Sequence, residues 1–269
     1  MIKLLFKKII PSRYLPAARR VLARFTIKNR PVSYRYHGDD ESVLQSCIAY
    51  NIHGGYCVPQ SSIQRPAAQK ILTGQVWEPD TIEFMCSSSK DGDIVHAGTY
   101  FGDFIPAIAK SRINGACVWA FEPNPENFRC ASITIKLNDL QNVSIQNAGL
   151  GDKASEMSMK VADQKGVSLG GASQLVDSSD VQQGKVVVVN IVTIDDIVPS
   201  DRNVAIIQLD VEGFERQALT GAMQTIERTK PVLILENLPE QQWLEDNILK
   251  QGYRIAGRLH DNTYLVPEN

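Results

Sequence analysis

The chain has 269 residues, 43% of them hydrophobic, which is enough apolar material for one large globular core. Its formal net charge of −2 argues against a protein that binds nucleic acid through an overall positive charge. No apolar run reaches the roughly 18 residues that a membrane-spanning helix requires. The five cysteines lie at wide, irregular spacings without a Cys-x-x-Cys motif, which is typical of reduced thiols in a cytoplasmic protein.

The first 38 residues contain ten Lys or Arg residues and no acidic residue. In residues 1–30 these charges alternate with hydrophobic side chains, and no signal-peptide cleavage site is evident. One interpretation is a basic amphipathic segment that makes peripheral contact with an anionic membrane surface. The other is a helical extension that packs on its own domain or on the second subunit of a homodimer. Pro11 and Pro16 interrupt any long helix, which favours this second interpretation.

Residues 31–90 show little periodicity beyond short helices expected at 67–72 and 81–87. We therefore divide the chain into a basic extension that covers the substrate side, residues 1–75, and an α/β domain, residues 76–269. Within the extension, His53, Tyr56 and Arg65 are candidate substrate contacts. A purely structural role is the alternative for each of them.

The most informative pattern lies in residues 93–122. An apolar run at 93–97 leads through the glycine turn 98–102 into a helix at 103–111, and a second apolar run, 117–121, ends in Glu122. Glycines let the backbone approach a ligand, and an acid at the end of the second strand accepts hydrogen bonds from ribose hydroxyls. Glu122 lies 24 positions after Gly98, close to the spacing of about 20 in such units. The pattern predicts a nucleoside-binding unit.

Further apolar runs alternate with helical segments along the rest of the chain. The expected helices are 125–138, 214–228 and 241–251, and the expected strands are 143–148, 157–161, 185–192, 204–209, 232–235, 253–257 and 262–266. Strands 157–161 and 185–192 indicate an antiparallel excursion around a flexible Gly/Ser loop at 166–173. The other strands predict a mostly parallel sheet with helices on both faces and an antiparallel edge formed by the last two strands.

Four of these strands end in polar residues. The four ends carry Gly98-Thr99-Tyr100, Glu122-Pro123-Asn124, Asp210-Val211-Glu212-Gly213 and Glu236-Asn237. Because ligands of open parallel sheets bind beyond the carboxyl ends of the strands, we expect one binding site there.

The motifs at these strand ends resemble those of FkbM-family S-adenosylmethionine-dependent methyltransferases. The matching stretches are HAGTYFGD at 96–103, FEPN at 121–124, QLDVEGFE at 208–215 and LILEN at 233–237. The resemblance covers about residues 91–237. It implies the class I methyltransferase fold, a Rossmann-like α/β domain with a seven-stranded, mostly parallel sheet and an antiparallel last strand. It also implies S-adenosyl-L-methionine as the cofactor.

The resemblance also implies roles for individual residues. Four residues would lie near the methionine part of the cofactor: Gly98, Thr99, Gly102 and Asp103. Glu122 would hold the ribose, with Pro123 and Asn124 beside the adenosine. The adenine edge would be lined by Ala148, Gly149 and Leu150, and Asp210 would face the methyl donor. This chain departs from the family pattern at three positions of the site. His96 replaces an aspartate and Tyr100 replaces an asparagine or glycine, and the resemblance implies that both bind the cofactor at the mouth of its pocket. Gln208 replaces a lysine.

A hydroxyl acceptor must lose its proton during methyl transfer, so a carboxylate or histidine is expected beside it. Asp210 and Glu212 are the candidate catalytic carboxylates, and His96 is a candidate proton relay. For Glu212 the alternative is a carboxylate that stabilises a helix N-terminus, and for His96 it is a structural hydrogen bond. Glu236 contacts either cofactor or acceptor, and His260 borders the acceptor pocket. Asp210, Glu212 and Glu236 could also bind a divalent ion, but no spacing requires one, so we expect no metal.

These observations favour an O-methyltransferase that acts on a hydroxyl, with a sugar of a glycan, glycolipid or secondary metabolite as the acceptor and no role for nucleic acid. One alternative is an NAD-dependent oxidoreductase, which predicts a G-x-G-x-x-G turn where only Gly98 and Gly102 are present. The other alternative is a non-catalytic nucleoside-binding protein of the same fold.

Overall fold

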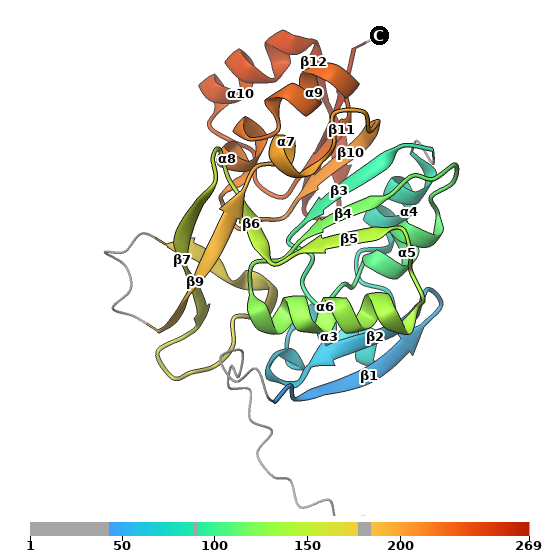
Figure 1. Cartoon of the computed structure of the whole chain (residues 1–269), viewed down its shortest axis with the longest axis vertical. Coiled ribbons are helices and arrows are strands. Elements are labelled where there is room, and N and C mark those ends of the chain that lie inside the picture. The colour runs from blue at the N-terminus through green and yellow to red at the C-terminus, as the bar shows by residue number, and fades with distance from the viewer. Residues whose placement is uncertain (1–42, 89–90, 177–183, 269) are drawn as a thin grey trace, which may run out of the picture. The chain divides into compact units, whose positions relative to one another are not determined.

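The computed structural model describes residues 43–88, 91–176 and 184–268 (Figure 1). The helix and the membrane contact expected within residues 1–30 lie outside these ranges. The described residues all belong to one compact unit. None of the helices within these ranges combines the length and the hydrophobicity needed to cross a bilayer.

A seven-stranded sheet forms the centre of this unit. Its order is β12-β13-β11-β10-β3-β4-β5. The strands are β3 (Asp93–Ala97), β4 (Val118–Phe121), β5 (Val143–Gln146), β10 (Val204–Leu209), β11 (Val232–Leu235), β12 (Tyr253–Leu259) and β13 (Asn262–Pro267). The five strands from β11 to β5 are parallel, and β13 runs antiparallel to both of its neighbours. The predicted sheet with its antiparallel edge is confirmed.

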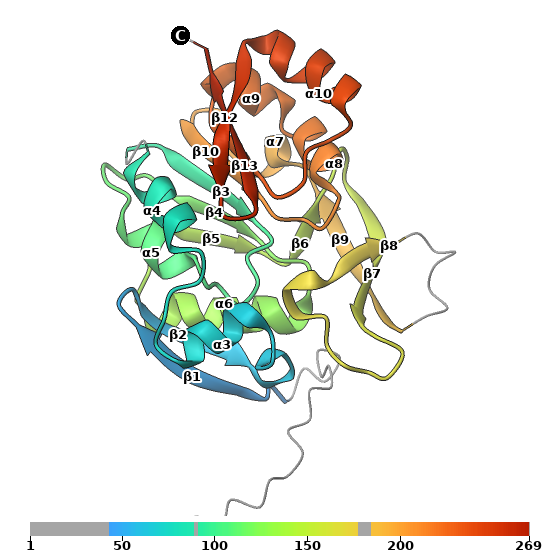
Figure 2. The same cartoon turned by 180° about the vertical axis from the view of Figure 1, so that it is seen from behind.

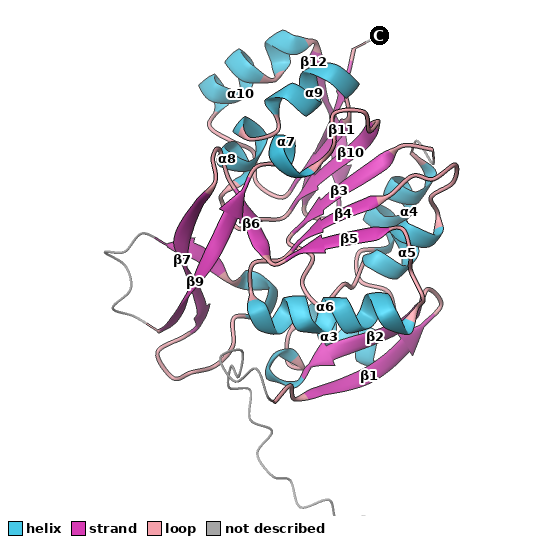
Figure 3. Cartoon of the chain, viewed as in Figure 1, coloured by secondary structure: helices cyan, strands magenta, loops and turns pink. Residues whose placement is uncertain are grey.

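Helices cover both faces of this sheet (Figure 3). One face packs against α7 (Ile194–Ile197), α8 (Glu215–Thr220), α9 (Met223–Thr229) and α10 (Gln241–Asn247), and the other packs chiefly against α4 (Pro79–Ser87) and α5 (Ile105–Lys110), with α6 (Pro125–Leu137) beside them. Val95 belongs to the first core and its neighbour Ile94 to the second, because successive strand residues point to opposite faces. Burial on both faces explains why these strands are apolar throughout.

Two expected elements are divided in the structure. The helix expected at 214–228 is interrupted after Thr220, where a side chain on Gly221 would overlap the carbonyl oxygen of Gly151. The strand expected at 143–148 ends at Gln146. The next residue, Asn147, donates from Nδ2 to the carbonyls of Glu122 and Pro123 at 2.8 and 3.1 Å. The chain then continues as β6 (Ala148–Leu150) in a second sheet.

This second sheet has the order β6-β9-β7-β8 and includes β7 (Ser155–Ala162), β8 (Gln174–Val176) and β9 (Lys185–Val192). Strands β7 and β9 are antiparallel, as the expected excursion requires. The Gly/Ser loop at 166–173 contains a short 3₁₀ helix, Gly170–Ala172. Two other 3₁₀ helices are Gln60–Ser62 and Leu249–Gln251.

The sequence did not predict a hairpin of β1 (Ser46–Asn51) and β2 (Gly54–Pro59), which α3 (Pro66–Leu72) follows (Figure 2). Strand β2 lies against α6, where Cys57 N donates to Thr134 Oγ1 at 3.0 Å and Gly55 N donates to Asn138 Oδ1 at 3.1 Å. Five consecutive residues of β2 are buried. The strand therefore lacks the alternating pattern that marks a surface hairpin.

Candidate active site

The turn after β3 brings three strand ends together. Gly98 (φ 77°), Tyr100 (φ 54°) and Gly102 (φ 86°) all adopt left-handed conformations. The amides of Gly98 and Thr99 donate to the carbonyl of Phe121 at 3.1 and 3.2 Å, which ties the turn to β4. A Cβ on Gly98 would overlap the carbonyl oxygen of Asp210 at the end of β10. Glycine is therefore required for the close approach of β3 and β10.

Glu122 lies beside this turn and is only 4% exposed. Its Oε2 accepts a hydrogen bond from Tyr100 N at 2.7 Å, and its Oε1 accepts from Asn124 N at 2.9 Å and Asn127 Nδ2 at 3.4 Å. Burial raises the pKa of Glu122 to about 8, although these hydrogen bonds oppose the shift. Since two carboxylate oxygens offer about four lone-pair positions, the side chain retains capacity for a ligand hydroxyl.

A first pocket opens between Glu122 and the second sheet and contains about 460 Å³ of space that is partly open to solvent. Its apolar walls are Phe121, Leu150, Met159, Leu175 and Val211, and its polar lining residues are Glu122, Ser173, Asp210 and Glu212. The expected adenine-side residues Pro123, Ala148, Gly149 and Leu150 all line it. Asn124 does not. It caps α6, accepts from Glu126 N at 3.0 Å and donates to Ser173 Oγ at 3.1 Å.

A second pocket adjoins the first and shares Gly98, Gly171, Asp210 and Glu212 with it. Carboxylates dominate its charge. They come from Glu78, Asp103, Asp210, Glu212, Glu236 and Asp261, whereas Arg65 is its one Lys or Arg lining residue within the described ranges. The Arg65 side chain also donates from Nη2 to the carbonyl of Ser168 at 2.6 Å, so it holds the Gly/Ser loop at the mouth of this pocket.

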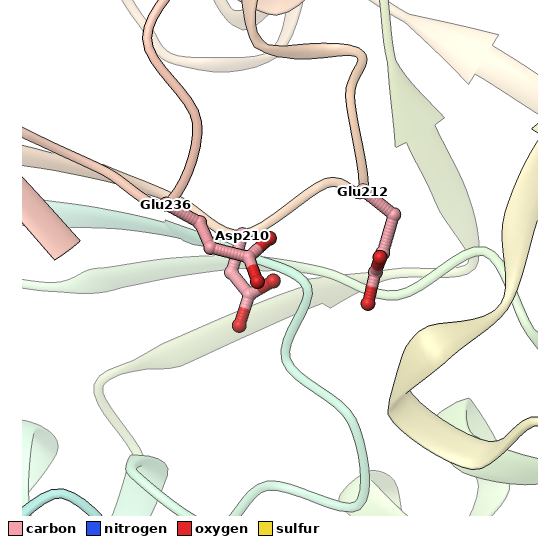
Figure 4. Close-up of side chains that lie close together, drawn as sticks. All are labelled: Asp210, Glu212 and Glu236. Carbon is pink, nitrogen blue, oxygen red and sulfur yellow. The ribbon is translucent and has the colours of Figure 1, made fainter. Parts of the chain in front are cut away.

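Asp210, Glu212 and Glu236 gather where the two pockets meet (Figure 4). One carboxylate oxygen of each residue lies within 4.8 Å of the other two. Burial and then the charge of Glu236 raise the pKa of Asp210 well above its ordinary value, and the same two causes raise the pKa of Glu212. The cluster therefore favours a positively charged or proton-donating ligand.

His96 is 2% exposed and lines the second pocket. Its Nδ1 forms a hydrogen bond with Gln208 Oε1, and its ring stacks on Phe104 with centroids 5.4 Å apart. Because an amide oxygen can only accept, Nδ1 carries the proton and Nε2 keeps its lone pair. Within the described residues Nε2 has no hydrogen-bond partner. Burial lowers the pKa of His96 to about 4, against the effect of Gln208, so the ring is neutral near pH 7.

Some of the remaining predicted site residues line the second pocket, and others line neither pocket. Tyr100, Asp103 and Glu236 line the second pocket, and burial raises the pKa of Asp103 to about 7. Thr99 and Gly102 line neither pocket. The Thr99 hydroxyl donates to the His96 carbonyl at 3.0 Å, and Gly102 packs against Ala131 and Thr134 of α6.

Three of the expected substrate contacts, His53, Tyr56 and His260, also lie outside the pocket linings. Tyr56 is fully buried in β2. His53 is placed in the β1–β2 turn, where its carbonyl accepts from Lys110 Nζ at 2.5 Å. The Nδ1 of His260 lies 3.4 Å from Glu78 Oε1, and its ring meets the Trp77 ring edge-on. The two residues that follow His260 in the chain, Asp261 and Asn262, do line the second pocket.

Sequence reasoning missed several pocket residues that come from distant elements. These are Trp77, Glu78, Phe104, Phe121, Met159, Gly171, Ser173, Leu175, Val211, Asp261 and Asn262. The Gly/Ser composition of the loop at 166–173 was the available signal for Gly171 and Ser173. Met159 and Leu175 follow the ordinary strand pattern, so only the position of the second sheet brings them to the pocket.

The sheet order, the glycine turn after β3 and the buried acid after β4 define a protein of the class I methyltransferase type. The comparison with family models agrees. The chain matches the methyltransferase FkbM domain over residues 96–264, well over half of its length, and it belongs to that family. It is an S-adenosylmethionine-dependent methyltransferase, which decides against the NAD-dependent alternative.

The chain also shows weak similarity to several solved structures. Methyltransferase FkbM from Methylobacillus flagellatus is 20% identical over 65% of this chain and 43% of its own, with a TM-score of 0.47. TYW2 from M. jannaschii, in complex with AdoMet, is 13% identical over 83% of this chain and 84% of its own, with a TM-score of 0.43. A SAM-dependent methyltransferase from Aquifex aeolicus is 12% identical over 76% of this chain and 93% of its own, with a TM-score of 0.40. None of the curated protein sequences compared with the chain matches it.

Proposed function

We propose that the protein is an O-methyltransferase that methylates a hydroxyl group of a small molecule, namely a sugar of a glycan, glycolipid or secondary metabolite. The observation that carries this proposal is the junction of two pockets at Gly98, Gly171, Asp210 and Glu212. One pocket has the lining of a nucleoside site, and the other is rich in groups that accept hydrogen bonds. A methyl donor and a hydroxyl acceptor can meet at that junction.

The first pocket fits the cofactor in its chemistry. Glu122 has a free acceptor position for a ribose hydroxyl, and Phe121, Leu150, Met159 and Leu175 provide apolar walls for the adenine ring. The cofactor also carries positive charge. Asp210 and Glu212 are carboxylates at the junction, and a cation beside them relieves their repulsion of Glu236.

The second pocket favours a neutral, hydroxyl-rich acceptor. Its carboxylates and the side-chain oxygen of Asn262 accept hydrogen bonds, as sugar hydroxyls require. Six carboxylates opposed by Arg65 disfavour a phosphate or a nucleic-acid backbone at this position, because like charges repel. This electrostatic argument is the structural support for a sugar over a polyanion.

The bound cofactor supplies a methyl group on a sulfonium, whose departing thioether is neutral, so alignment of the reactants contributes much of the acceleration. The protein residues must then orient the acceptor and remove its proton. We assign proton removal to His96, whose Nε2 lone pair is held in the correct tautomer by Gln208. We assign orientation of the acceptor hydroxyl to Asp210 and Glu212, which line both pockets.

The first test of this proposal is direct ligand binding. Calorimetric titration of the purified full-length protein with S-adenosylhomocysteine and, separately, with NAD should show tight binding of the former alone. Binding of NAD without S-adenosylhomocysteine would contradict the assigned cofactor site.

The second test identifies the product. The protein is incubated with methyl-labelled S-adenosylmethionine and a panel of neutral sugars, amino sugars, glycolipids and RNA. Label in an O-methyl ether of a sugar supports the proposal, and label on RNA, on nitrogen or on carbon contradicts it. His96→Gln should abolish most of the label transfer, whereas Glu156→Gln, at an exposed position on β7, should leave it unchanged.

A further inference from the structure

We infer that Asp210, Glu212 and Glu236 bind one hard divalent cation, such as Mg²⁺, Mn²⁺ or Ca²⁺, through oxygen ligands at the junction of the two pockets. The sequence allowed a divalent ion at these three acids, but no spacing required one, so no metal was expected. The role of the ion in methyl transfer rests on the proposed function. Its binding does not depend on that function.

The separations within the cluster suit a shared ion. One oxygen from each carboxylate lies within 4.8 Å of the others. Hard divalent cations lie about 2.0–2.6 Å from their oxygen ligands, so two ligands of one ion are at most about 4–5 Å apart. Figure 4 shows Asp210 and Glu236 with their carboxylates close together and Glu212 extending from the following loop. The arrangement leaves the remaining coordination positions for water or acceptor oxygens.

The fold holds two of these acids rigidly. Leu209 and Leu235 are paired in the register of β10 and β11, so Asp210 and Glu236 follow at neighbouring strand ends. The Glu236 amide donates to the Leu209 carbonyl at 3.0 Å, which fixes that register to the last residue. Strand ends position ligands more precisely than mobile loops do.

A second, independent observation points to a ligand in the same pocket. His96 is 2% exposed and Asn262 is 3% exposed, and both line the pocket with the three acids. His96 Nε2 and Asn262 Oδ1 have no hydrogen-bond partner within the described residues. Buried polar atoms of folded proteins are rarely left unpaired. Both atoms can accept hydrogen bonds, so the expected occupant brings donors, as the waters and hydroxyls around a cation do.

The side chains of His96, Asp210 and Glu236 lie on one side of the sheet at the strand ends. His96 is paired with Gln208, and Gln208 with Ile234. Asp210 and Glu236 follow these partners two residues later, one residue beyond the ends of β10 and β11, and their amides still donate to the carbonyls of Ala97 and Leu209 at 3.2 and 3.0 Å. Because the ladder continues to both acids, they point to the same face as the residues two positions before them. The unpaired nitrogen and the carboxylates therefore belong to one continuous lining.

A cation here would resolve a weakness in the proposed chemistry. A buried, neutral histidine is a weak base for a sugar hydroxyl, and a divalent ion lowers the pKa of an oxygen acid that it binds. The acceptor oxygen would form its bond to the methyl carbon while the carbon–sulfur bond breaks with its electron pair left on sulfur, and the hydroxyl proton would pass to His96 Nε2. The metal ion would be neither oxidised nor reduced in this step.

Metal titration tests the site without any methyl acceptor. The full-length protein is dialysed against chelator until elemental analysis finds no metal and is then titrated with Mn²⁺ by calorimetry and by electron paramagnetic resonance of free Mn²⁺. We expect one bound ion per chain, at least tenfold weaker binding in Glu236→Gln, and no change in Glu227→Gln, an exposed position on α9. Asp210→Asn provides a second variant, and circular dichroism confirms that each variant is folded.

The outcomes separate this inference from the proposed function. Absence of Mn²⁺ binding at millimolar concentration, or equal affinity in wild type and Glu236→Gln, would overturn the cation site. Full methyl transfer in excess chelator would overturn the catalytic role of the ion while leaving the methyltransferase assignment intact. Stoichiometric Mn²⁺ binding without methylation of any hydroxyl would support the site and contradict the proposed function.

Discussion

Gly98 and Asp210, separated by more than one hundred residues in the sequence, approach so closely that only glycine fits at position 98. The position of a Cβ on Gly98 coincides with the carbonyl oxygen of Asp210. This contact joins the glycine turn after β3 to the first acid after β10. The junction of the two pockets is built on it, because both residues line both pockets.

Substitution of Gly98 by alanine is expected to lower the free energy of unfolding by more than about 2 kcal/mol, through steric overlap added to a left-handed backbone. Gly115 provides a matched control, since it has the same φ of 77° but no atom within 4 Å of its Cβ position. Urea denaturation of both alanine variants measures the difference. Equal destabilisation of Gly98→Ala and Gly115→Ala would show that the contact with Asp210 is unimportant.

Glu122→Gln should weaken the binding of S-adenosylhomocysteine by about 10- to 100-fold, which corresponds to roughly 1.4–2.8 kcal/mol. The amide keeps one acceptor oxygen, but its NH₂ group faces the backbone N–H of Tyr100 or Asn124, which are both donors. Calorimetric titration with S-adenosylhomocysteine compares the affinity of this variant with that of the control variant Glu156→Gln. Unchanged affinity in Glu122→Gln would remove this carboxylate from the cofactor site.

Protonation of His96 should subtract from the stability of the folded protein in acid. The pKa of His96 in the folded state is about 4, below the ordinary value of 6.5. A lowered folded-state pKa means that the stabilisation is present above pH 6.5 and is lost as the pH falls from 6.5 through about 4. The lowered pKa of His96 corresponds to a change of roughly 3 kcal/mol in the free energy of unfolding.

Urea midpoints measured between pH 7 and pH 4 test this effect, with His96→Gln as the comparison. The variant should lose less stability than the wild type over that interval, because glutamine does not titrate. The raised pKa values of Glu122 and Asp103 act in the opposite direction, as their stabilisation is lost when the pH rises through about 8 and about 7. Parallel curves for the wild type and the variant would contradict the assignment of a buried, neutral His96.

Asp93→Asn should destabilise the fold by about 2–3 kcal/mol without changing cofactor affinity. Asp93 is 2% exposed and accepts from Arg202 Nε at 2.7 Å, Arg202 Nη2 at 2.6 Å and Trp119 Nε1 at 2.8 Å. These contacts lie at the amino-terminal end of β3, opposite the site. Asp201→Asn, at the exposed neighbour of Arg202, serves as the control. A loss of S-adenosylhomocysteine binding in folded Asp93→Asn would contradict this separation of roles.

The limits of sequence-based prediction are visible in particular elements. Strand β10, strand β11 and the acid after each were predicted to the residue, because continuous apolar runs followed by polar residues mark buried parallel strands. The β1–β2 hairpin was missed, because its contacts with α6 depend on side chains 77 and 83 residues away. The break between α8 and α9 was missed as well, since it arises where Gly221 meets Gly151.

The sequence by itself determined the class of protein: local runs and motifs set the succession of strands and helices in a nucleoside-binding sheet and the family to which the chain belongs. Only the tertiary structure decided which groups share the site. It placed Met159, Leu175 and Asn262 at the pockets and set His53 apart from them. The physical reason is that strand and helix patterns are encoded within a few residues, whereas the meeting of Asp210, Glu212 and Glu236 depends on strand register and on packing between distant segments.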